Sequence, residues 1–401
     1  MITVKEAREI IFSNLYQPSI REVELLEAQG EYLMEDIKAD RDFPPFNRVA
    51  MDGIAISFEA YERGQRVFSI EGLQAAGMPQ SALNDSNNCL EVMTGSMLPK
   101  GTDTVIRYED IEIDEKVSHA TVQANIQITQ EQNIHKQATD RRAGDLLIES
   151  GTLLGAAEIA IAATVGKSTL KVGQKPKVAI VSTGDELVDV DTQPEAHQIR
   201  QSNSYALSAA LEPLKIISER FHLKDDKKSL ITALNGILEN FDVLILSGGV
   251  SKGKLDYVPE VLDELNVAKC FHKVKQRPGK PFWFGKNNGG KVVFALPGNP
   301  VSTFSCFYHY VKPWLFKSMG IEQKTLKARL TKDFVFEAPL TNFLQVKISY
   351  SSQGQLEATP VAGKGSGDLA NLLNADGFME LDADQSGFFA GEIYPVTIYR
   401  I

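Results

Sequence analysis

The sequence predicts a multidomain protein that combines a doubly wound α/β domain with a discontinuous helical domain, a β-rich insertion and a C-terminal β-domain resembling a barrel. The chain has 401 residues, more than a single hydrophobic core usually serves. Strand and helix patterns alternate over residues 174–324, as expected for a parallel sheet with helices on both faces. Short β-type runs, separated by turn residues, dominate residues 41–140 and 325–401.

The discontinuous helical domain is predicted from residues 1–40 and 141–173. Thr3 and Glu6 have the spacing of a capping box, and apolar residues then recur at helical spacing: Ala7, Ile10, Ile11 and Leu15. A second helical run, GAAEIAIAATVG, covers residues 155–166 and stops at its glycine. Because the β-rich insertion separates these helices in sequence, we expect them to pack together as one domain.

The insertion at residues 41–140 and the segment at 325–401 are both predicted to be β-structures. The insertion holds the runs GIAI, RVFSI, TVIRYEDIEI and ATVQANIQI between Gly, Pro and Asn residues. The C-terminal segment holds ARLTKDFVF, FLQVKISY and IYPVTIY, with turns at SSQGQ and ADGF. Its length suits a small barrel or sandwich.

Residues 174–324 are predicted to alternate between strands and helices. The expected strands are KVAIVST, residues 216–223, VLILS at 243–247, and a strand pair that ends in VVFALPG. The expected helices lie near 205–214, at 227–240, at 257–265 and from 300 to about 317.

Composition narrows the class of protein. The net charge of −10 argues against a protein that coats nucleic acid or an anionic membrane. The three cysteines are far apart, so they predict no disulfide framework and favour the cytoplasm. The charged N-terminus is not a signal peptide, and no apolar run approaches the roughly 20 residues that span a bilayer.

Three strands of the predicted sheet end in unusual loops. The loops are TGDE at 183–186, GGVSKGKLD at 248–256 and LPGNP at 296–300. Ligands of open α/β sheets bind beyond the carboxyl ends of the strands. Each loop alone could be an ordinary turn or helix start, but three such loops on one sheet predict a binding cleft.

The glycine-rich loop has the composition of an anion site. Its glycines allow backbone N–H groups to approach an anion, and hydroxyls of Ser247 and Ser251 add donors. Lys252 and Lys254 add positive charge. An aspartate in such a loop would repel phosphate unless a cation lay between them.

Asp256 is therefore a candidate Mg²⁺ ligand, with Glu186 of TGDE as the second carboxylate. A basic cluster lies between the second and third loops: Lys273, Lys275, Arg277 and Lys280. Together these features predict a site for a small polyanion such as a nucleotide or a phosphorylated cofactor. Cys306 and His309, and the pair Phe282 and Trp283, are better explained as core packing.

The ordered motifs resemble those of the molybdopterin molybdenumtransferases, the MoeA-type enzymes to which the C-terminal domain of gephyrin is related. TGDEL, SGGVSKGKLDY, RPGKP and LPGNPVS carry the resemblance in the α/β domain. FPPFNRVAMDGIAI, with Asp52, and MTGSMLPKGTDTVIRYE, with Thr94 and Glu109, carry it in the insertion. GKGSGDLANLLNADGF, which contains Ser366, carries it in the C-terminal domain. The resemblance covers nearly the whole chain.

This resemblance implies an elongated homodimer of four-domain subunits. The active site would lie between the α/β domain of one subunit and the β-rich insertion of the other. The implied reaction takes adenylylated molybdopterin and molybdate, inserts molybdenum at the dithiolene and releases AMP in the presence of Mg²⁺. The adenylylating enzyme and molybdoenzyme acceptors are possible protein partners.

The resemblance also assigns roles to individual residues. Glu186 and Asp256 would hold Mg²⁺, and Asp52 and Thr94 of the facing subunit would complete the catalytic site. Arg277 and Lys280 would meet the pterin phosphate or molybdate. The remaining candidate substrate-binding residues are Ser247, Gly248, Gly249, Ser251, Pro297, Gly298, Asn299, Pro300, Asp140 and Ser366. The N–H groups of Gly248 and Gly249 would hold phosphate oxygens.

Three departures from the family pattern stand out. HKQATD replaces a stretch that usually contains Arg and Gly-Glu-Asp, so His135 stands in place of Arg and only Asp140 is retained. Arg277 stands where many members have Lys, which keeps the charge but adds a planar, bidentate donor. Lys254 stands where many members carry an acid.

Two other functions stay open at this point. A molybdopterin adenylyltransferase could use the α/β domain alone, but the insertion and the C-terminal domain favour metal insertion. A gephyrin-like scaffold needs no catalytic groups, whereas Asp52, Glu186 and Asp256 are all present. Molybdate and tungstate are so similar in size and charge that the sequence does not discriminate between them.

Overall fold

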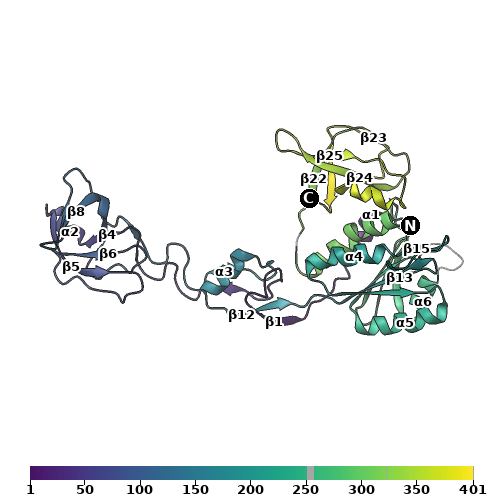
Figure 1. The fold of residues 1–401 in the computed structure, drawn as a ribbon, viewed down its shortest axis with the longest axis horizontal. Helices are drawn as coiled ribbons and strands as arrows, with labels where there is room; N and C mark the ends of the chain where they lie inside the picture. Colours follow the sequence, from purple (N-terminus) through teal and green to yellow (C-terminus); the bar gives the residue numbers. More distant parts are fainter. Residues whose placement is uncertain (251–256, 322, 401) are drawn as a thin grey trace. The chain divides into compact units, whose positions relative to one another are not determined.

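The computed structural model describes residues 1–250, 257–321 and 323–400. Contacts divide the chain into two compact units (Figure 1). Unit 1 comprises Met1–Met34, Gly151–Gly155 and Thr169–Ile401, and unit 2 comprises Glu35–Ser150 and Ala156–Ser168. The predicted mixed class is confirmed, since unit 1 holds an α/β sheet and a β-barrel and unit 2 holds a second β-structure. The finer division into four domains remains a prediction.

The α/β sheet of unit 1 has six strands, of which four are parallel. In spatial order they are β16 (Ser218–Leu223), β13 (Val178–Thr183), β17 (Val243–Ser247), β21 (Val292–Leu296), β20 (Trp283–Asn287) and β18 (Val267–His272). The last two run antiparallel to their neighbours. The central strands are continuous runs of Val, Ile, Leu, Phe and Ala, which suits strands buried on both faces.

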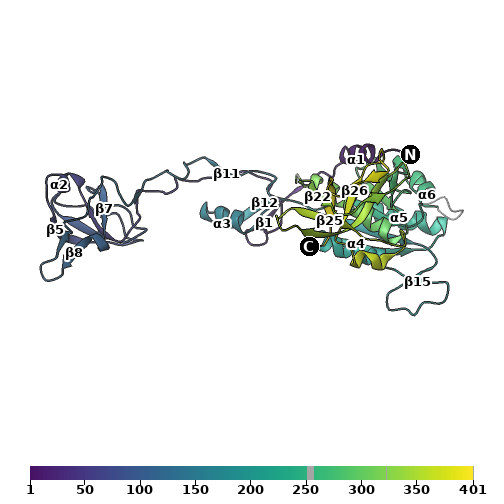
Figure 2. The same ribbon diagram turned by 90° about the horizontal axis from the view of Figure 1, so that it is seen from above.

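Helices cover both faces of this sheet, as predicted (Figures 1 and 2). One core contains α5 (Lys227–Asn240) and α6 (Val258–Glu264), and the other contains α4 (Asn203–Leu211) and the helix that begins at Pro300. That helix runs through α7 (Pro300–Cys306), a π-helical turn at Phe307–Val311 and α8 (Lys312–Ser318). Successive strand residues alternate between the cores, as the two-residue period of a strand requires.

The N-terminal helix α1 (Val4–Phe12) has the predicted capping box, with Thr3 and Glu6 bonded to each other's backbone N–H. Its buried face joins the core on the α4 side of the sheet and contacts α8. The indole N–H of Trp314 donates to the carbonyl of Asn14 at 2.9 Å. The helix α1 therefore packs within unit 1, whereas residues 156–168, with which we expected it to form one discontinuous domain, belong to unit 2.

Unit 1 also contains several shorter elements outside the six-stranded α/β sheet. They are β1 (Ile20–Glu24), which pairs with β12 (Thr169–Gly173), β14 (Leu187–Val188), which pairs with β15 (Ile199–Arg200), and the 3₁₀ turn Glu212–Leu214.

The C-terminal part of unit 1 is a barrel, as expected from its alternating pattern. Its strands follow the order β24 (Thr341–Tyr350), β25 (Leu356–Pro360), β22 (Leu326–Leu330), β28 (Ile393–Ile398) and β26 (Gly377–Leu381). Pairing of β26 with β24 closes the ring. Also present are β19 (Gln276–Arg277), which joins β24, the pair β23 (Phe334–Val335) and β27 (Gly387–Phe388), and the 3₁₀ turn Leu369–Leu373.

Unit 2 contains a six-stranded sheet in the order β7, β4, β6, β5, β9, β8. The strands are β4 (Gly53–Ile56), β5 (Val67–Gln74), β6 (Cys89–Val92), β7 (Thr104–Arg107), β8 (Ile111–Asp114) and β9 (His119–Val122). The unit also contains β2 (Ile37–Lys38) paired with β11 (Leu146–Ile148), β3 (Arg48–Val49) paired with β10 (Ile134–His135), α2 (Phe58–Glu62), the 3₁₀ turn Tyr108–Asp110 and α3 (Ala156–Thr164).

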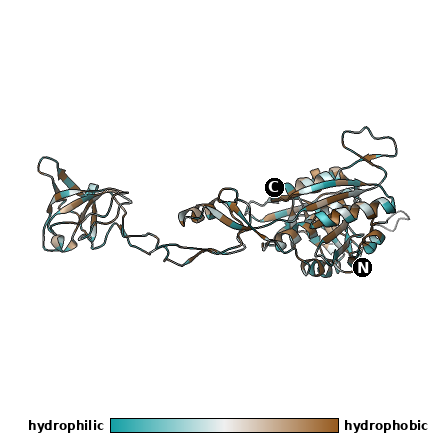
Figure 3. Ribbon diagram, turned by 90° about the horizontal axis from the view of Figure 1, so that it is seen from below, coloured by the Kyte–Doolittle hydropathy of each residue, from teal (hydrophilic) through white to brown (hydrophobic). Residues whose placement is uncertain are grey.

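Hydropathy along the ribbon agrees with this layered packing. The helices carry both hydrophobic and hydrophilic residues, as expected for helices that cover a sheet (Figure 3). Over the residues that the structure describes, no helix combines the length and the apolar character needed to cross a bilayer.

Candidate functional site

The three predicted loops meet at the carboxyl ends of adjacent parallel strands. Thr183 ends β13, Ser247 ends β17 and Leu296 ends β21. A Cβ built on Gly248 would lie 2.7 Å from the carbonyl oxygen of Thr183, and one on Gly298 would lie 3.6 Å from the Cα of Gly248. The structure therefore brings together the first, second and third loops, as the sequence predicted.

Bare glycine backbone is what allows this close approach. Gly248 and Gly249 have φ values of +106° and +66°, a region that favours glycine. A Cβ on Gly249 would lie 2.6 Å from Cγ2 of Val258. The N–H of Gly248, expected to hold a phosphate oxygen, instead donates to the carbonyl of Leu296 at 3.2 Å. The contribution of Gly248 is thus its missing side chain.

Asn203, at the start of α4, ties two of the loops together and was not singled out from the sequence. Its side-chain amide donates to Oγ of Ser247 at 2.8 Å and to the carbonyl of Gly298 at 2.7 Å. Oγ of Ser247 also lies 3.4 Å from Oγ1 of Thr303 on α7. The Ser247 hydroxyl is therefore engaged within the protein, so it positions the loops. The only signal in the sequence is an Asn near a predicted helix start.

Thr183 presents a buried hydroxyl to the glycine-rich loop. The residue is 5% exposed, and its Oγ1 would be 2.9 Å from a Cβ on either Gly248 or Gly249. Among the residues that the structure describes, this hydroxyl has no hydrogen-bond partner. Because buried hydroxyls are normally paired, an unpaired one at a strand end indicates a place for a ligand atom or a water.

Glu186 lies at the rim of the same site and is exposed. Its carboxylate folds back over the backbone of Gly184, where a Cβ would be 2.6 Å and 2.8 Å from the two oxygens. The Nε2–H of His222, on β16, donates to the carbonyl of Gly184 at 3.1 Å and holds this turn. Asp256 and Ser251, the other predicted residues of this region, lie outside the described residues.

The third loop connects the α/β sheet to the barrel. The side-chain amide of Asn299, the residue before α7, donates to Oγ of Ser366 at 2.9 Å. The N–H of Val301 donates to the carbonyl of Ser366 at 3.1 Å. Oγ1 of Thr303 donates to the carbonyl of Pro297 at 2.5 Å. The structure thus brings Pro297, Asn299, Pro300 and Ser366 together.

The loop that carries Arg277 and Lys280 lies beside α7. A Cβ on Gly279 would be only 2.5 Å from Sγ of Cys306, so this loop lies directly on the helix that the third loop begins. Arg277 and Lys280 flank that contact and are exposed. The guanidinium of Arg277 lies 5.8 Å from the ring centre of Phe336. Both cations therefore remain accessible to an anion beside α7.

Unit 2 brings together two further predicted residues. The backbone N–H of Thr94 donates to Oδ1 of Asp52 at 2.6 Å. Hydrogen bonds from Thr94 lower the pKa of Asp52 from its ordinary value, because they favour the charged carboxylate. Gly53 follows directly, and a Cβ there would lie 1.9 Å from the carbonyl oxygen of Ile106. The glycine of the motif AMDG is thus required, because any side chain at this position would collide with β7.

His135, one of the departures from the family pattern, lies between a cation and an anion. Nη2 of Arg48 donates to Nδ1 of His135 at 2.9 Å, so the ring proton is on Nε2, which lies 3.0 Å from Oδ1 of Asp140. The loop HKQATD therefore keeps a linked set of polar groups. The sequence did not single out Arg48, because its contact with His135 depends on the pairing of β3 with β10.

Cys306 and His309 are buried, which confirms the prediction of core packing. Burial raises the pKa of the Cys306 thiol to about 12 and lowers the pKa of His309 to about 4. Phe282 and Trp283 are also fully buried. Over the described part of the chain, no group of three or more His, Cys, Asp or Glu residues is placed to hold a metal ion.

Matches to known protein families cover nearly the whole chain. Residues 2–166 match the family described as the MoeA N-terminal region (domain I and II). Residues 179–317 match a probable molybdopterin binding domain, and residues 327–399 match the MoeA C-terminal region (domain IV). The three matches follow the order of the sequence motifs.

Individual relatives match this chain over nearly its full length. The chain is 40% identical to a molybdopterin molybdenumtransferase from Synechocystis sp., over 98% of this chain and 99% of the relative. It is 31% identical to a protein of the same name from Staphylococcus epidermidis, over 99% of this chain and 95% of the relative. A crystal structure of a MoeA molybdopterin biosynthesis protein from Pyrococcus horikoshii superposes with a TM-score of 0.85 at 30% identity, and the match covers both chains completely.

Proposed function

The chain belongs to the MoeA-type molybdopterin molybdenumtransferases, transferases of molybdenum cofactor biosynthesis, and on this premise we propose the reaction that it performs. It inserts molybdenum from molybdate into adenylylated molybdopterin and releases AMP. One observation supports the phosphate part of this proposal most directly: the buried hydroxyl of Thr183, beside Gly248 and Gly249, has no hydrogen-bond partner among the described residues. A strand-end site of this kind suits a phosphorylated ligand.

The anionic parts of the substrate have suitable partners in unit 1. The N–H of Gly249 and the hydroxyl of Thr183 are the donors that we assign to phosphate oxygens. Arg277 and Lys280 supply exposed positive charge beside the third loop. They would receive molybdate or the pterin phosphate, with Asn299 and Ser366 defining the far side of the site.

The residues present fit a Mg²⁺ ion held mainly by the substrate. The exposed carboxylate of Glu186 is the one described acidic side chain among the assigned ligands, and Mg²⁺ commonly takes one or two carboxylates together with substrate phosphates. When bound, the ion would neutralise charge that develops on the phosphoanhydride. Glu186 would hold the ion at the rim, where its carboxylate already lies over Gly184.

Opening a phosphoanhydride depends more on positioning and charge than on a covalent nucleophile. Asp52 suits a positioning role, because its lowered pKa keeps it ionised and makes it a poor general acid at neutral pH. As a carboxylate it would accept a hydrogen bond from the attacking water or oxyanion. Thr94 fixes its orientation through the 2.6 Å hydrogen bond.

Asp52 and Thr94 belong to unit 2, whereas Glu186 and the strand-end loops belong to unit 1. We propose that a homodimer completes the site, with unit 2 of one subunit serving unit 1 of the other. A mixture of Asp52→Asn and Glu186→Gln proteins should then regain activity through heterodimers. No recovery, with subunit exchange demonstrated, would contradict a shared site.

The reaction is tested by measuring AMP release from adenylylated molybdopterin with and without Mg²⁺. Molybdate, tungstate and no oxyanion are compared in parallel. We expect release that requires both the oxyanion and Mg²⁺, and the ratio of the two oxyanions gives the selectivity. Consumption of ATP with bare molybdopterin would instead indicate an adenylyltransferase, and tight binding without release would indicate a scaffold.

A further inference from the structure

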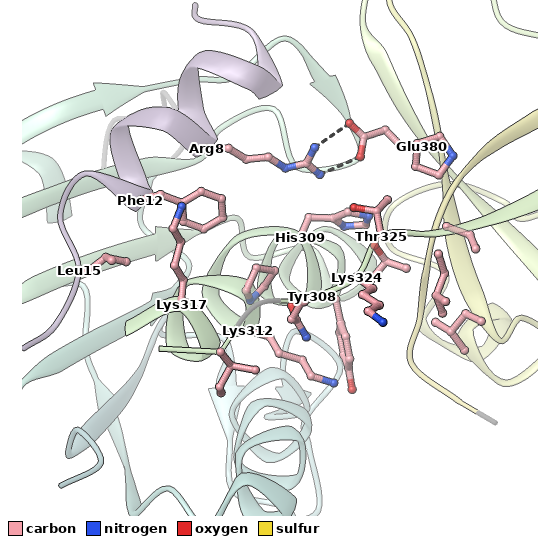
Figure 4. A pocket seen from close by; sticks show the side chains of 18 of the residues that line it. Arg8, Phe12, Leu15, Tyr308, His309, Lys312, Lys317, Lys324, Thr325 and Glu380 are labelled. Atoms are coloured by element: carbon pink, nitrogen blue, oxygen red, sulfur yellow. Dashed lines mark hydrogen bonds and ion pairs between the residues drawn. The ribbon is translucent and has the colours of Figure 1, made fainter. Parts of the chain in front are cut away.

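A cavity of about 790 Å³ lies in unit 1 between α1, α8, the segment after α8 and strands β26 and β28 of the barrel (Figure 4). On the helix that starts at Pro300, the first residue to line it is Tyr308, roughly 12 Å along the axis at ~1.5 Å per residue. The helix that starts at Pro300 runs back along the sheet, and Lys317 at its other end is roughly 25 Å further along the helix axis, at ~1.5 Å per residue. The cavity is therefore separate from the site described above.

Three lysines line this cavity and form no ion pair with any residue that the structure describes. They are Lys312, Lys317 and Lys324. Arg8 also lines the cavity, but its guanidinium forms two hydrogen bonds of 2.8 Å with the carboxylate of Glu380. That pair is neutral as a whole, so among the described lining residues the three lysines give a positive balance of charge.

Aromatic rings hold two of these lysines in place. Nζ of Lys312 lies 5.0 Å from the ring centre of Tyr308, and Nζ of Lys317 lies 4.9 Å from that of Phe12. Figure 4 shows the ends of Lys312 and Lys324 on the same side of the cavity, beside Tyr308, with Lys317 on the opposite side. Lys312 is half-buried, so its charge is costly without an anion nearby.

His309 gives an independent sign of a missing ligand. It lines the cavity and is 2% exposed. Its Nδ1 lies 2.8 Å from the carbonyl oxygen of Ser305, so Nδ1 carries the proton and donates. Nε2 is then a lone-pair acceptor, and it has no partner among the described residues. A buried acceptor of this kind needs a donor from a ligand or a water.

We propose that this cavity binds a small organic phosphate whose ring carries a hydroxyl or amino group. A phosphate dianion matches several ammonium groups better than a single carboxylate does, and lysine is a common phosphate ligand. Apolar side chains would contact the ring: Phe12, Leu15, Pro313 and Ile321. The ring hydroxyl or amino group would donate to Nε2 of His309.

The test is calorimetric titration of the full-length protein with 4-aminophenyl phosphate. Phenyl phosphate, which lacks the ring donor, and inorganic phosphate, which lacks the ring, are the comparison ligands. We expect the amino compound to bind tightest and inorganic phosphate weakest. The variants Lys312→Gln and Lys324→Gln should each weaken binding about tenfold. Lys324 is exposed, so its variant remains informative even if Lys312→Gln folds poorly.

Two controls make the result specific. Lys228→Gln removes an exposed lysine from α5, on the other face of the sheet, and should leave binding unchanged. His309→Phe should abolish the preference for 4-aminophenyl phosphate over phenyl phosphate. Equal binding by the Lys324→Gln variant and the unmodified protein would overturn the proposal. So would a loss of binding in Arg277→Gln, an exposed substitution at the strand-end site, because that result would move the ligand there.

Discussion

The helix from Pro300 to Ser318 has a different kind of site at each end. At its start, the strand-end loops are held mostly by bonds among themselves, such as those from Asn203 and Asn299. At its end, lysines line a cavity without acidic partners among the described residues. The first site is thus organised before a ligand arrives, whereas the second leaves charge for a ligand to neutralise.

The two sites should respond differently to substitutions. The close packing of bare glycines makes the loops of the first site sensitive to added volume. A site built from lysine side chains tolerates small changes of volume but weakens as salt screens its charges. Substitutions along the one helix can therefore separate steric from electrostatic effects.

Gly248→Ala should have the largest effect. The new Cβ would lie 2.7 Å from the carbonyl of Thr183 at a φ of +106°, so both crowding and backbone strain act. We expect a loss of about 2–4 kcal/mol in the free energy of unfolding. AMP release should fall about 100-fold or more, because the loops shift. Denaturant unfolding and turnover measure the two effects.

Gly290→Ala is the matched control for Gly248→Ala. Gly290 has a φ of +80°, but no atom lies within 4 Å of its Cβ position. The variant Gly290→Ala should lose free energy of unfolding through backbone strain alone, and its rate of AMP release should stay unchanged. Equal losses of turnover in both variants would show that close packing of the loops is not what the site requires.

Protonation of His309 should give the next largest effect, a fall in the free energy of unfolding at acidic pH. Burial holds its pKa near 4 in the folded protein, below the ordinary value of 6.5. The unfolded chain therefore takes up a proton first as the pH falls, and folding weakens between about pH 6.5 and 4. At pH 4.5 this group alone should cost about 2.5 kcal/mol relative to pH 7.5.

His309→Phe removes this titration while keeping a ring to stack on Phe343. The difference in unfolding free energy between pH 7.5 and pH 4.5 should be smaller in the variant. If the two proteins lose the same amount of stability, His309 is not the group that titrates. An organic phosphate bound in the lysine cavity should raise the melting temperature at pH 7.5.

Asn203→Ala tests the bonds within the strand-end site. It removes both donations, to Ser247 and to Gly298, and leaves the hydroxyl of the buried Ser247 less satisfied. We expect a loss of about 1–2 kcal/mol in stability and a clear fall in turnover. Asn235→Ala, on the exposed surface of α5, is the control and should change neither. Unchanged turnover in Asn203→Ala would mean that the loops keep their positions without this side chain.

The sequence predicted the loops at the start of the helix because each loop follows a buried strand and contains glycine. Strand ends of a parallel sheet lie together whatever the side chains, so Thr183, Gly248 and Gly298 could be assigned to one place. The donors Asn203 and His222 could not be found, because they approach only when α4 and β16 pack. The hydrogen bond from the N–H of Gly248 to the carbonyl of Leu296 could not be predicted either, because it forms only when β17 pairs with β21.

The cavity at the other end of the helix had no signal in the sequence. Arg8 and Glu380 are far from Lys312 in the chain, and they line one cavity with it only because α1 and the barrel both pack near α8. In unit 2, Arg48 reaches His135 through a strand pair of two residues, too short to predict. Side-chain sites assembled by tertiary packing leave no local pattern, whereas backbone sites at strand ends do.

Ser366→Ala should have the smallest effect on stability and still report on the site. Oγ of Ser366 accepts an exposed hydrogen bond from Asn299, and its loss should cost about 0.5 kcal/mol. Without that bond the Asn299 amide loses its fixed orientation at the start of α7, and we expect KM for the adenylylated substrate to rise more than kcat falls. Ser366→Thr keeps an acceptor and should restore KM, as steady-state AMP release would show. A fall in kcat alone would instead place Ser366 among the groups that act on the transition state, and would move the chemistry toward the barrel side of the helix start.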